Sequence, residues 1–126
     1  MTYSIVARDP DTGELGVAVE SHFLAVGSLC PWAEAGTGAV ATQASVDPAY
    51  GPCGLERLRL GVDPTTALAD LVAADPMAEH RQVALVDTEG RVAAHTGALA
   101  IADAGHVVGD GYSCQANMMT NAGVPE

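Results

Sequence analysis

The sequence predicts an α+β domain in which β-strands at both ends of the chain enclose a pair of helices. Short apolar segments separated by turn residues occur before residue 45 and again after residue 80, whereas helical spacing is confined to the middle. A helix does not follow nearly every strand, as alternating βαβ units would require. At 126 residues the chain is most simply one domain, spanning 1–126.

The first third of the chain is predicted to form two pairs of strands. Pro10 and Gly13 lie between the first two strands, where a chain reversal needs such residues, so these strands form a hairpin. The third and fourth strands of this part are predicted to belong to one sheet. The four predicted strands are 3–8, 15–20, 25–31 and 38–43.

Two helices are predicted in the middle of the chain. The first follows Pro48 and is stopped by Gly61. The second has Asp63 as its N-cap and Pro64 at its first helical position, and it ends before Pro76. Its apolar stripe consists of Ala67, Leu68, Leu71 and Val72.

The last third returns to strands. Residues 88–90 end in glycine and join the first two of these strands as a hairpin, and the last two are predicted as another. Residues 121–126 are typical of a loop that runs into the start of a helix, so we expect the sequence to be truncated relative to the natural gene product. The four predicted strands are 81–87, 91–96, 106–108 and 112–117.

Composition limits the partners of the chain. Sixteen acidic and five basic residues give a formal charge of −11, which repels nucleic acids and anionic membrane surfaces. No run of about 18 apolar residues and no basic-then-apolar leader is present, so a cytoplasmic location is predicted. Apolar residues make up 48% of the chain but aromatic residues only 4%, so the core must consist of Val, Leu and Ala.

No metal or other cofactor is predicted. The three cysteines, Cys30, Cys53 and Cys114, are widely spaced and are interpreted as buried reduced thiols. The spacing of His95 and His106, with Asp103 and Asp110 nearby, matches no compact ligand motif.

Thr2 is the first candidate catalytic residue. It follows a removable initiator methionine, and a terminal threonine supplies both a hydroxyl nucleophile and its own base, the α-amine, whose ordinary pKa is about 8. The alternative is a frayed first residue of an edge strand. Ser4 lies on the same face of the strand, and it either assists Thr2 or forms a local hydrogen bond.

Ser21 and His22 form a second candidate pair. They follow the second strand, and hairpin pairing brings them near the start of the first strand, where they could flank the same site as Thr2. His22 is a candidate acid or base near neutral pH. The alternative is a structural or solvated histidine in a loop.

Four other polar residues at strand ends are candidate substrate-binding groups. Thr42 with Gln43, and Asn117, suit an oxyanion hole or a clamp for a substrate amide, although buried amides that cap backbone groups are an equally good interpretation. Arg81 is a candidate for holding a substrate carboxylate, with a structural salt bridge to Asp75 or Glu79 as the alternative.

Several segments together resemble one bacterial family, known as domain of unknown function ten twenty-eight and usually classed as Ntn-hydrolase-like. The resemblance implies an αββα sandwich, in which two stacked sheets lie between helical layers, and it implies further helical sequence beyond residue 126. The matching segments, in order, are 3–9, 16–19, 38–44, 50–51, 81–82, 95–97 and 115–118.

The sequence therefore predicts hydrolysis of a C–N (amide) bond in a small molecule, by Thr2 or by a polar site at the strand ends. The rival hypothesis is a non-catalytic protein on the same fold that binds a small molecule or takes part in an assembly. In either case we expect a homo-oligomer, because a small helical layer leaves a sheet face to be covered by another copy.

Overall fold

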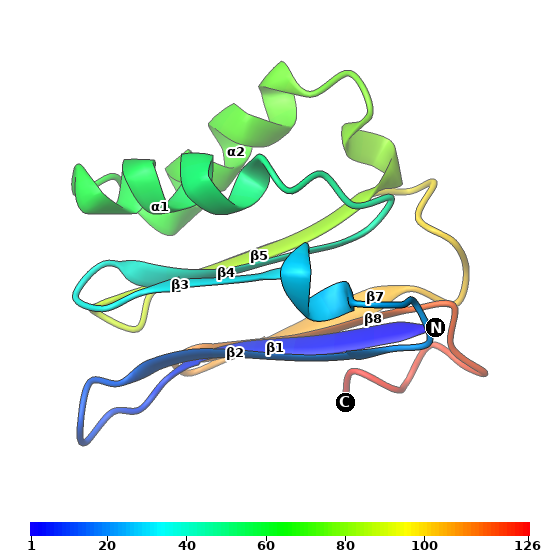
Figure 1. Cartoon of the computed structure of the whole chain (residues 1–126), viewed down its shortest axis with the longest axis horizontal. Helices are drawn as coiled ribbons and strands as arrows, with labels where there is room; N and C mark the ends of the chain where they lie inside the picture. Colours follow the sequence, from blue (N-terminus) through cyan, green and yellow to red (C-terminus); the bar gives the residue numbers. More distant parts are fainter.

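The computed structural model describes residues 1–126 and contains two antiparallel four-stranded sheets stacked on one another, with two helices above one of them (Figure 1). The predicted α+β class is confirmed. The strands are β1 (Thr2–Arg8), β2 (Leu15–Ser21), β3 (Pro31–Glu34), β4 (Gly38–Ala44), β5 (Arg81–Asp87), β6 (Val92–Thr96), β7 (Gly105–Gly109) and β8 (Tyr112–Asn117). The α-helices are α1 (Tyr50–Arg59) and α2 (Pro64–Ala74), and short 3₁₀ turns lie at Val26–Ser28 (η1) and Ala78–His80 (η2).

The first sheet joins the two ends of the chain. Its strand order is β2-β1-β8-β7, so β1 lies between its hairpin partner β2 and the last strand β8. Thr2, the first residue of β1, is opposite Ser21 on one side and opposite Asn117 on the other. Both predicted hairpins of this sheet are confirmed.

The second sheet has the order β3-β4-β5-β6, and it corrects one predicted strand. The strand expected at residues 25–31 instead occupies Pro31–Glu34, and it pairs with β4 across a turn in which Gly36 has a φ of +70°. The preceding residues cannot continue as a strand, because Ala25 adopts a left-handed conformation (φ 58°) and residues 26–28 form η1. Apolar composition predicted a strand without distinguishing it from an apolar loop.

The helices cover only the outer face of the second sheet. The predicted cap of α2 is confirmed, because the side chain of Asp63 accepts a hydrogen bond of 2.8 Å from the backbone N–H of Thr65. The helix ends at Ala74, before Pro76. Neither helix is long and apolar enough to cross a membrane.

The core has two parts of different character. Leucine and valine side chains fill the space between the helices and the second sheet, including Leu55, Leu68 and Leu85. The space between the two sheets is filled by smaller residues, including Ala39, Ala41 and Ala84. The predicted core of Val, Leu and Ala is thus confirmed, and small residues allow the two sheets to approach each other closely.

The outer face of the first sheet carries no helix within residues 1–126 (Figure 1). Tyr3 and Ile5 of β1 and Tyr112 of the neighbouring strand β8 are exposed on it. The residues described therefore form three layers of the four that the resemblance implies.

The packing of α1 on β3 yields a test of the fold. A Cβ added to Gly51 of α1 would lie 2.2–2.4 Å from ring carbons of Trp32, so we expect Gly51→Ala to lower the free energy of unfolding by about 1–3 kcal/mol. Denaturant unfolding measures this, and the fluorescence of the single tryptophan reports directly on the contact. Gly16→Ala is the matched control, because nothing lies within 4 Å of its new Cβ. Equal stability of the two variants would show that α1 does not pack this closely.

Candidate functional site

The candidate site lies at the edge of the molecule where β1 begins and β2, β4 and β8 end. A cavity of about 190 Å³ opens there, and we call it the strand-end cavity. Because neighbouring strands are antiparallel, the first residue of β1 meets the last residues of its partners. Six of the eight predicted site residues line this cavity: Thr2, Ser21, His22, Thr42, Gln43 and Asn117.

Three polar side chains form a row across the first sheet. Ser21, Thr2 and Asn117 are register partners, and side chains opposite each other in antiparallel strands lie on one face of the sheet. The hydroxyl oxygens of Thr2 and Ser21 are 2.8 Å apart. The predicted proximity of the Ser21–His22 segment to Thr2 is therefore confirmed.

The main-chain carbonyl of Met1 lies beside the Ser21–His22 segment and accepts hydrogen bonds from the Ser21 hydroxyl and the His22 backbone N–H. The Ser21 hydroxyl donates to this oxygen over 3.1 Å, the His22 backbone N–H lies 3.4 Å from it, and His22 Nδ1 lies 3.1 Å from it. Ser21 and His22 make no hydrogen bond to one another, so they do not form a catalytic dyad. They surround the peptide group that precedes Thr2.

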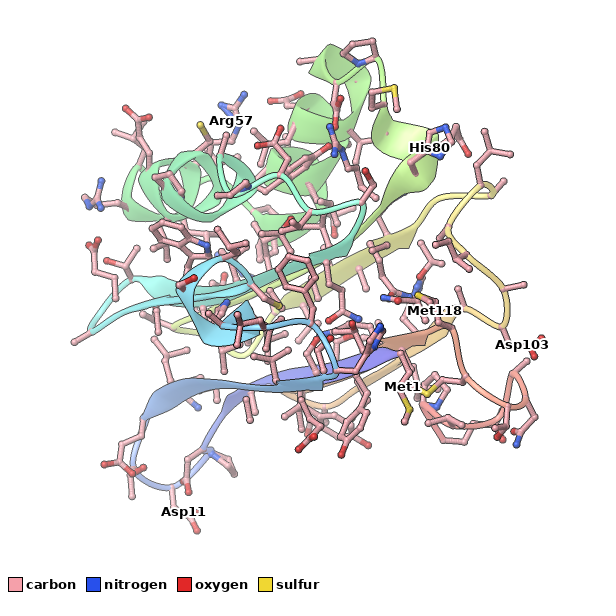
Figure 2. The ribbon with its side chains drawn as sticks, turned by 45° about the vertical axis from the view of Figure 1, so that its right-hand side comes forward. Met1, Asp11, Arg57, His80, Asp103 and Met118 are labelled. Atoms are coloured by element: carbon pink, nitrogen blue, oxygen red, sulfur yellow. The ribbon has the colours of Figure 1, made fainter.

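The amino group of Met1 lies at the same edge. It donates to His22 Nδ1 over 2.6 Å and lies 3.9 Å from the sulfur of Met118, and the two methionines are adjacent in Figure 2. Met1 itself is 55% exposed. The terminal residue therefore lies over the site at the molecular surface.

A network of buried amides centred on Gln82 adjoins the cavity, which its members Gln43 and Asn117 line. Two of its acceptors are backbone carbonyls, which cannot donate, so the NH₂ end of Gln82 must face them. Its Oε1 then accepts from Gln43 Nε2 (2.7 Å) and from Asn117 Nδ2 (3.0 Å). The oxygens near Gln82 Nε2 are Thr96 Oγ1 (2.9 Å), the Gly105 carbonyl (2.9 Å) and the Ala116 carbonyl (3.0 Å).

This orientation determines what the amides offer to a ligand. Both hydrogens of Gln43 Nε2 are directed within the chain, the second toward the Gln115 carbonyl at 3.4 Å. Asn117 uses one hydrogen of Nδ2 on Gln82, and its Oδ1 accepts no hydrogen bond from the chain. Asn117 therefore keeps one N–H and one acceptor oxygen available, whereas Gln43 has no free donor for an oxyanion.

Thr42 and Cys30 complete the inner wall. The Thr42 hydroxyl donates to the Asp47 carbonyl over 3.1 Å, which anchors the loop after β4. Burial raises the pKa of the Cys30 thiol to about 11, so this thiol stays protonated at neutral pH. Cys30 is a buried reduced cysteine, as predicted, whereas Cys53 is exposed and Cys114 is half-buried.

Ser4 lies deeper between the sheets and does not line the cavity. Its hydroxyl accepts from Gln115 Nε2 over 2.8 Å, and it is buried. Ser4 is therefore hydrogen-bonded as a structural residue, but to the neighbouring strand β8 and not locally, as the alternative had it. Ser4, Gln115 and Gln82 are thus polar residues buried between the two sheets, and we call them the polar seam.

Arg81 lies on the opposite face of the second sheet from Gln82, because successive residues of a strand alternate. It forms the predicted alternative, a salt bridge to Asp75 with Nε and Oδ2 2.8 Å apart. Its Nη1 also donates to the Ser45 carbonyl over 2.7 Å. Arg81 thus holds the loop after β4 and does not reach the cavity.

The apolar wall of the cavity was not predicted from the sequence. Its residues come from connecting segments that have no periodicity, so no pattern marks them. They are Phe23, Val26, Leu29, Val46, Ile101 and Met118. Gln82 was also missed as a structural centre, since one glutamine at the start of an apolar strand does not reveal its partners.

The two histidines considered as metal ligands serve as hydrogen-bonding residues. His95 Nε2 lies 3.0 Å from the Ala78 carbonyl, and His106 Nδ1 lies 2.8 Å from Thr96 Oγ1. Burial, with a smaller effect of the charge on His95, lowers the pKa of His106. His106 therefore joins the edge of the amide network through Thr96.

Fold and site together define a class: an α+β protein of two stacked antiparallel sheets with a polar site at their common strand ends. The chain belongs to the family described as "Family of unknown function (DUF1028)", which matches residues 2–126 and confirms the resemblance. A crystal structure of protein SPO2555 from Silicibacter pomeroyi, which carries the same family designation, is similar to it. The TM-score is 0.90 and the sequence identity 32%, over 94% of this chain and 53% of that chain.

The chain therefore spans about half the length of that solved structure. No curated protein matches the chain closely.

The amide network predicts a large loss of stability in Gln82→Leu. The substitution removes the partner of Asn117 Nδ2, of the buried Ala116 carbonyl and of the half-buried Gly105 carbonyl, and each buried group left unsatisfied costs about 1–3 kcal/mol. We expect the free energy of unfolding to fall by about 2–4 kcal/mol in urea titrations. Glu56→Gln, at an exposed position of α1, is the control, with a change within about 0.5 kcal/mol. A Gln82→Leu protein as stable as the control would contradict the central role of Gln82.

The Arg81–Asp75 pair predicts a pH dependence of stability. The hydrogen bond from Arg81 lowers the pKa of Asp75 below its ordinary value of 3.8 in the folded protein. The resulting stabilisation is fully present above pH 3.8 and is lost as the pH falls through the lowered value. We expect Asp75→Asn to remove this part of the acid-induced loss, measured by urea unfolding between pH 6 and pH 2.5.

Asp70→Asn is the matched control, since Asp70 is an exposed carboxylate of the same helix. It changes the net charge equally and should leave the pH profile as in the wild-type protein. Identical profiles for the Asp75→Asn variant and the wild-type protein would refute the role of the pair.

Proposed function

We propose that the protein hydrolyses a C–N (amide) bond in a small molecule and that Thr2, once freed of Met1, is the nucleophile. We further propose that its two sheets and helices belong to an αββα sandwich of the N-terminal nucleophile hydrolase type. The observation that carries the proposal is the position of Thr2. Its hydroxyl lies at a cavity, between Ser21 and Asn117 in one row of side chains.

Processing of the amino terminus is the first requirement. Threonine is small, Met1 is 55% exposed, and the start of the chain lies at the surface, so an aminopeptidase has access to the Met1–Thr2 bond. Removal of Met1 would leave the α-amine on the same residue as the hydroxyl. An amine of ordinary pKa, about 7.7–8.0, is partly unprotonated at neutral pH and can act as a base.

In the proposed reaction this amine acts as a base in both half-reactions, the attack by Thr2 and the hydrolysis of the ester. The α-amine takes the proton of Thr2 Oγ1 as the oxygen attacks the substrate carbonyl carbon, which gives a tetrahedral intermediate. Collapse of this intermediate breaks the C–N bond, and the ammonium returns its proton to the departing nitrogen. Water, activated by the same amine, then hydrolyses the Thr2 ester and releases the carboxylic acid.

The donors around the Met1 carbonyl are the proposed oxyanion-stabilising groups. The Ser21 hydroxyl and the His22 backbone N–H both point to this oxygen, and removal of Met1 would free them beside Thr2. Ser21 Oγ is also 2.8 Å from Thr2 Oγ1, so it lies next to the attacking atom. The free N–H of Asn117, on the other side of Thr2, is a third donor.

Retention of Met1 would favour the second candidate function, a non-catalytic protein that binds a small molecule in the same cavity. The contact of the Met1 amine with His22 Nδ1, at 2.6 Å, supports this candidate, because it gives the retained methionine a defined place over the site. The two functions differ in whether Thr2 is terminal.

The decisive experiment combines intact mass with two variants of Thr2. We expect the untagged protein to lack the mass of methionine, and we expect Thr2→Ala to reduce amide hydrolysis by at least about 10³-fold because the nucleophile is absent. Thr2→Ser is the matched control, since it keeps a hydroxyl on the terminal residue and should keep measurable activity.

A mass that includes Met1, or equal activity of the wild-type protein and Thr2→Ala, would refute the N-terminal nucleophile mechanism. Stabilisation by a ligand without turnover would then support the binding function.

A further inference from the structure

We infer that the strand-end cavity takes an uncharged amide whose acyl group is a compact apolar chain. This inference deepens the proposed function and rests on it for the amide linkage. The selection for size and charge rests on the cavity alone. Its residues support the inference in four ways: by their polarity, by the positions of the basic side chains, by the volume they enclose and by the acceptor that Asn117 leaves free.

The wall of the cavity is predominantly apolar. Eight of its fourteen lining residues are hydrophobic, and they come from segments far apart in the sequence. Phe23, Ile101 and Met118 are 58%, 60% and 40% exposed, so large apolar side chains also surround the opening. Exposed apolar groups gathered at a cavity are typical of a site that binds an apolar group.

No lysine or arginine side chain reaches the cavity, and the one basic side chain that lines it, His22, has its Nδ1 2.6 Å from the Met1 amino group. The chain has no lysine, and none of its five arginines lines the cavity. Three of them are held by acidic partners: Arg59 by Glu34, Arg81 by Asp75 and Arg91 by Asp87. Arg8 and Arg57 lie on other surfaces, in the β1–β2 hairpin and in α1.

A carboxylate or phosphate on the acyl group would therefore be desolvated at the apolar wall with no lysine or arginine as its partner, which is unfavourable. The formal charge of −11 adds a repulsive field for any anion that approaches. Cys30, which lines the inner wall, is neutral because its thiol stays protonated. An uncharged acyl group avoids both the desolvation of an anion and the repulsion by the net negative charge.

The volume sets the size of the acyl group. An engineered apolar cavity of about 150 Å³ in another protein holds benzene, so a cavity of about 190 Å³ accommodates about six to eight non-hydrogen atoms. A six-carbon acyl chain fits this estimate. Longer chains would have to extend past the exposed apolar side chains at the opening.

Asn117 distinguishes an amide from an ester. Gln82 fixes its orientation, so that Asn117 Oδ1 remains an acceptor without a partner in the chain, next to Thr2. An amide N–H can donate to this oxygen, whereas an ester has no hydrogen to offer there. The polar end of the cavity is thus complementary to a carboxamide.

The test measures binding to the full chain carrying Thr2→Ala, so that no turnover interferes. Hexanamide is compared with adipamate, the same six-carbon amide with a terminal carboxylate, and with methyl hexanoate. NMR titration follows the side-chain NH₂ resonances of Gln43 and Asn117. We expect hexanamide to shift them with a Kd on the order of 10 mM, and adipamate and the ester to bind at least about tenfold more weakly.

A variant pair tests the role of charge. Val26→Arg introduces a cation into the wall and should reverse the preference toward adipamate, whereas Val108→Arg, at an exposed position outside the cavity, should not. If Val26→Arg does not fold, the comparison of the three ligands on the Thr2→Ala protein still tests whether the cavity prefers an uncharged amide.

The outcomes separate this inference from the proposed function. Equal or tighter binding of adipamate, or no shift with hexanamide up to about 50 mM, would overturn the inference. Selective binding of hexanamide by a protein that hydrolyses no amide would support the inference and refute the proposed hydrolase. Hydrolysis that prefers anionic acyl groups would support the hydrolase and overturn the inference.

Discussion

The structure depends on one constraint: the amides buried between the two sheets must all be hydrogen-bonded. Gln82 meets it by joining β5 of the second sheet to the ends of β7 and β8 in the first. Because two of its acceptors are backbone carbonyls, only one orientation satisfies the network. A shift of one sheet against the other would leave several groups unsatisfied at once, so the network fixes the relative position of the sheets at this edge.

The site follows from that position. The small residues between the sheets, such as Ala39, Ala41 and Ala84, bring the sheets close together, and the polar seam replaces them toward the strand ends. There the sheets no longer fill the space between them, and a cavity opens beside the first residue of β1. Thr2, the proposed nucleophile, therefore lies on a central strand, β1, which is hydrogen-bonded to β2 on one side and to β8 on the other.

Two adjacent residues, Arg81 and Gln82, show how the sheet assigns roles. Arg81 faces the helices and anchors the loop after β4 through the Ser45 carbonyl, while Gln82 faces the other sheet and accepts from Gln43 and Asn117, which line the cavity. For Arg81 the sequence left open a substrate carboxylate or a structural salt bridge, and for Gln82 it gave no sign of its partners. Alternation along a single strand decides both roles. The homo-oligomer predicted from the sequence remains a prediction.

The sequence by itself determined the α+β class, both helices with the Asp63 cap, seven of the eight strands, the family and most of the polar residues at the site, because these are recorded in local periodicity, turn residues and short segments. Only the tertiary structure decided that residues 25–30 are a loop, that Arg81 faces away from the cavity, and that Gln82 is the centre of the network. It also decided which apolar residues form the wall. The physical reason is that these properties depend on strand register and on the stacking of two sheets, which bring together residues far apart in the chain.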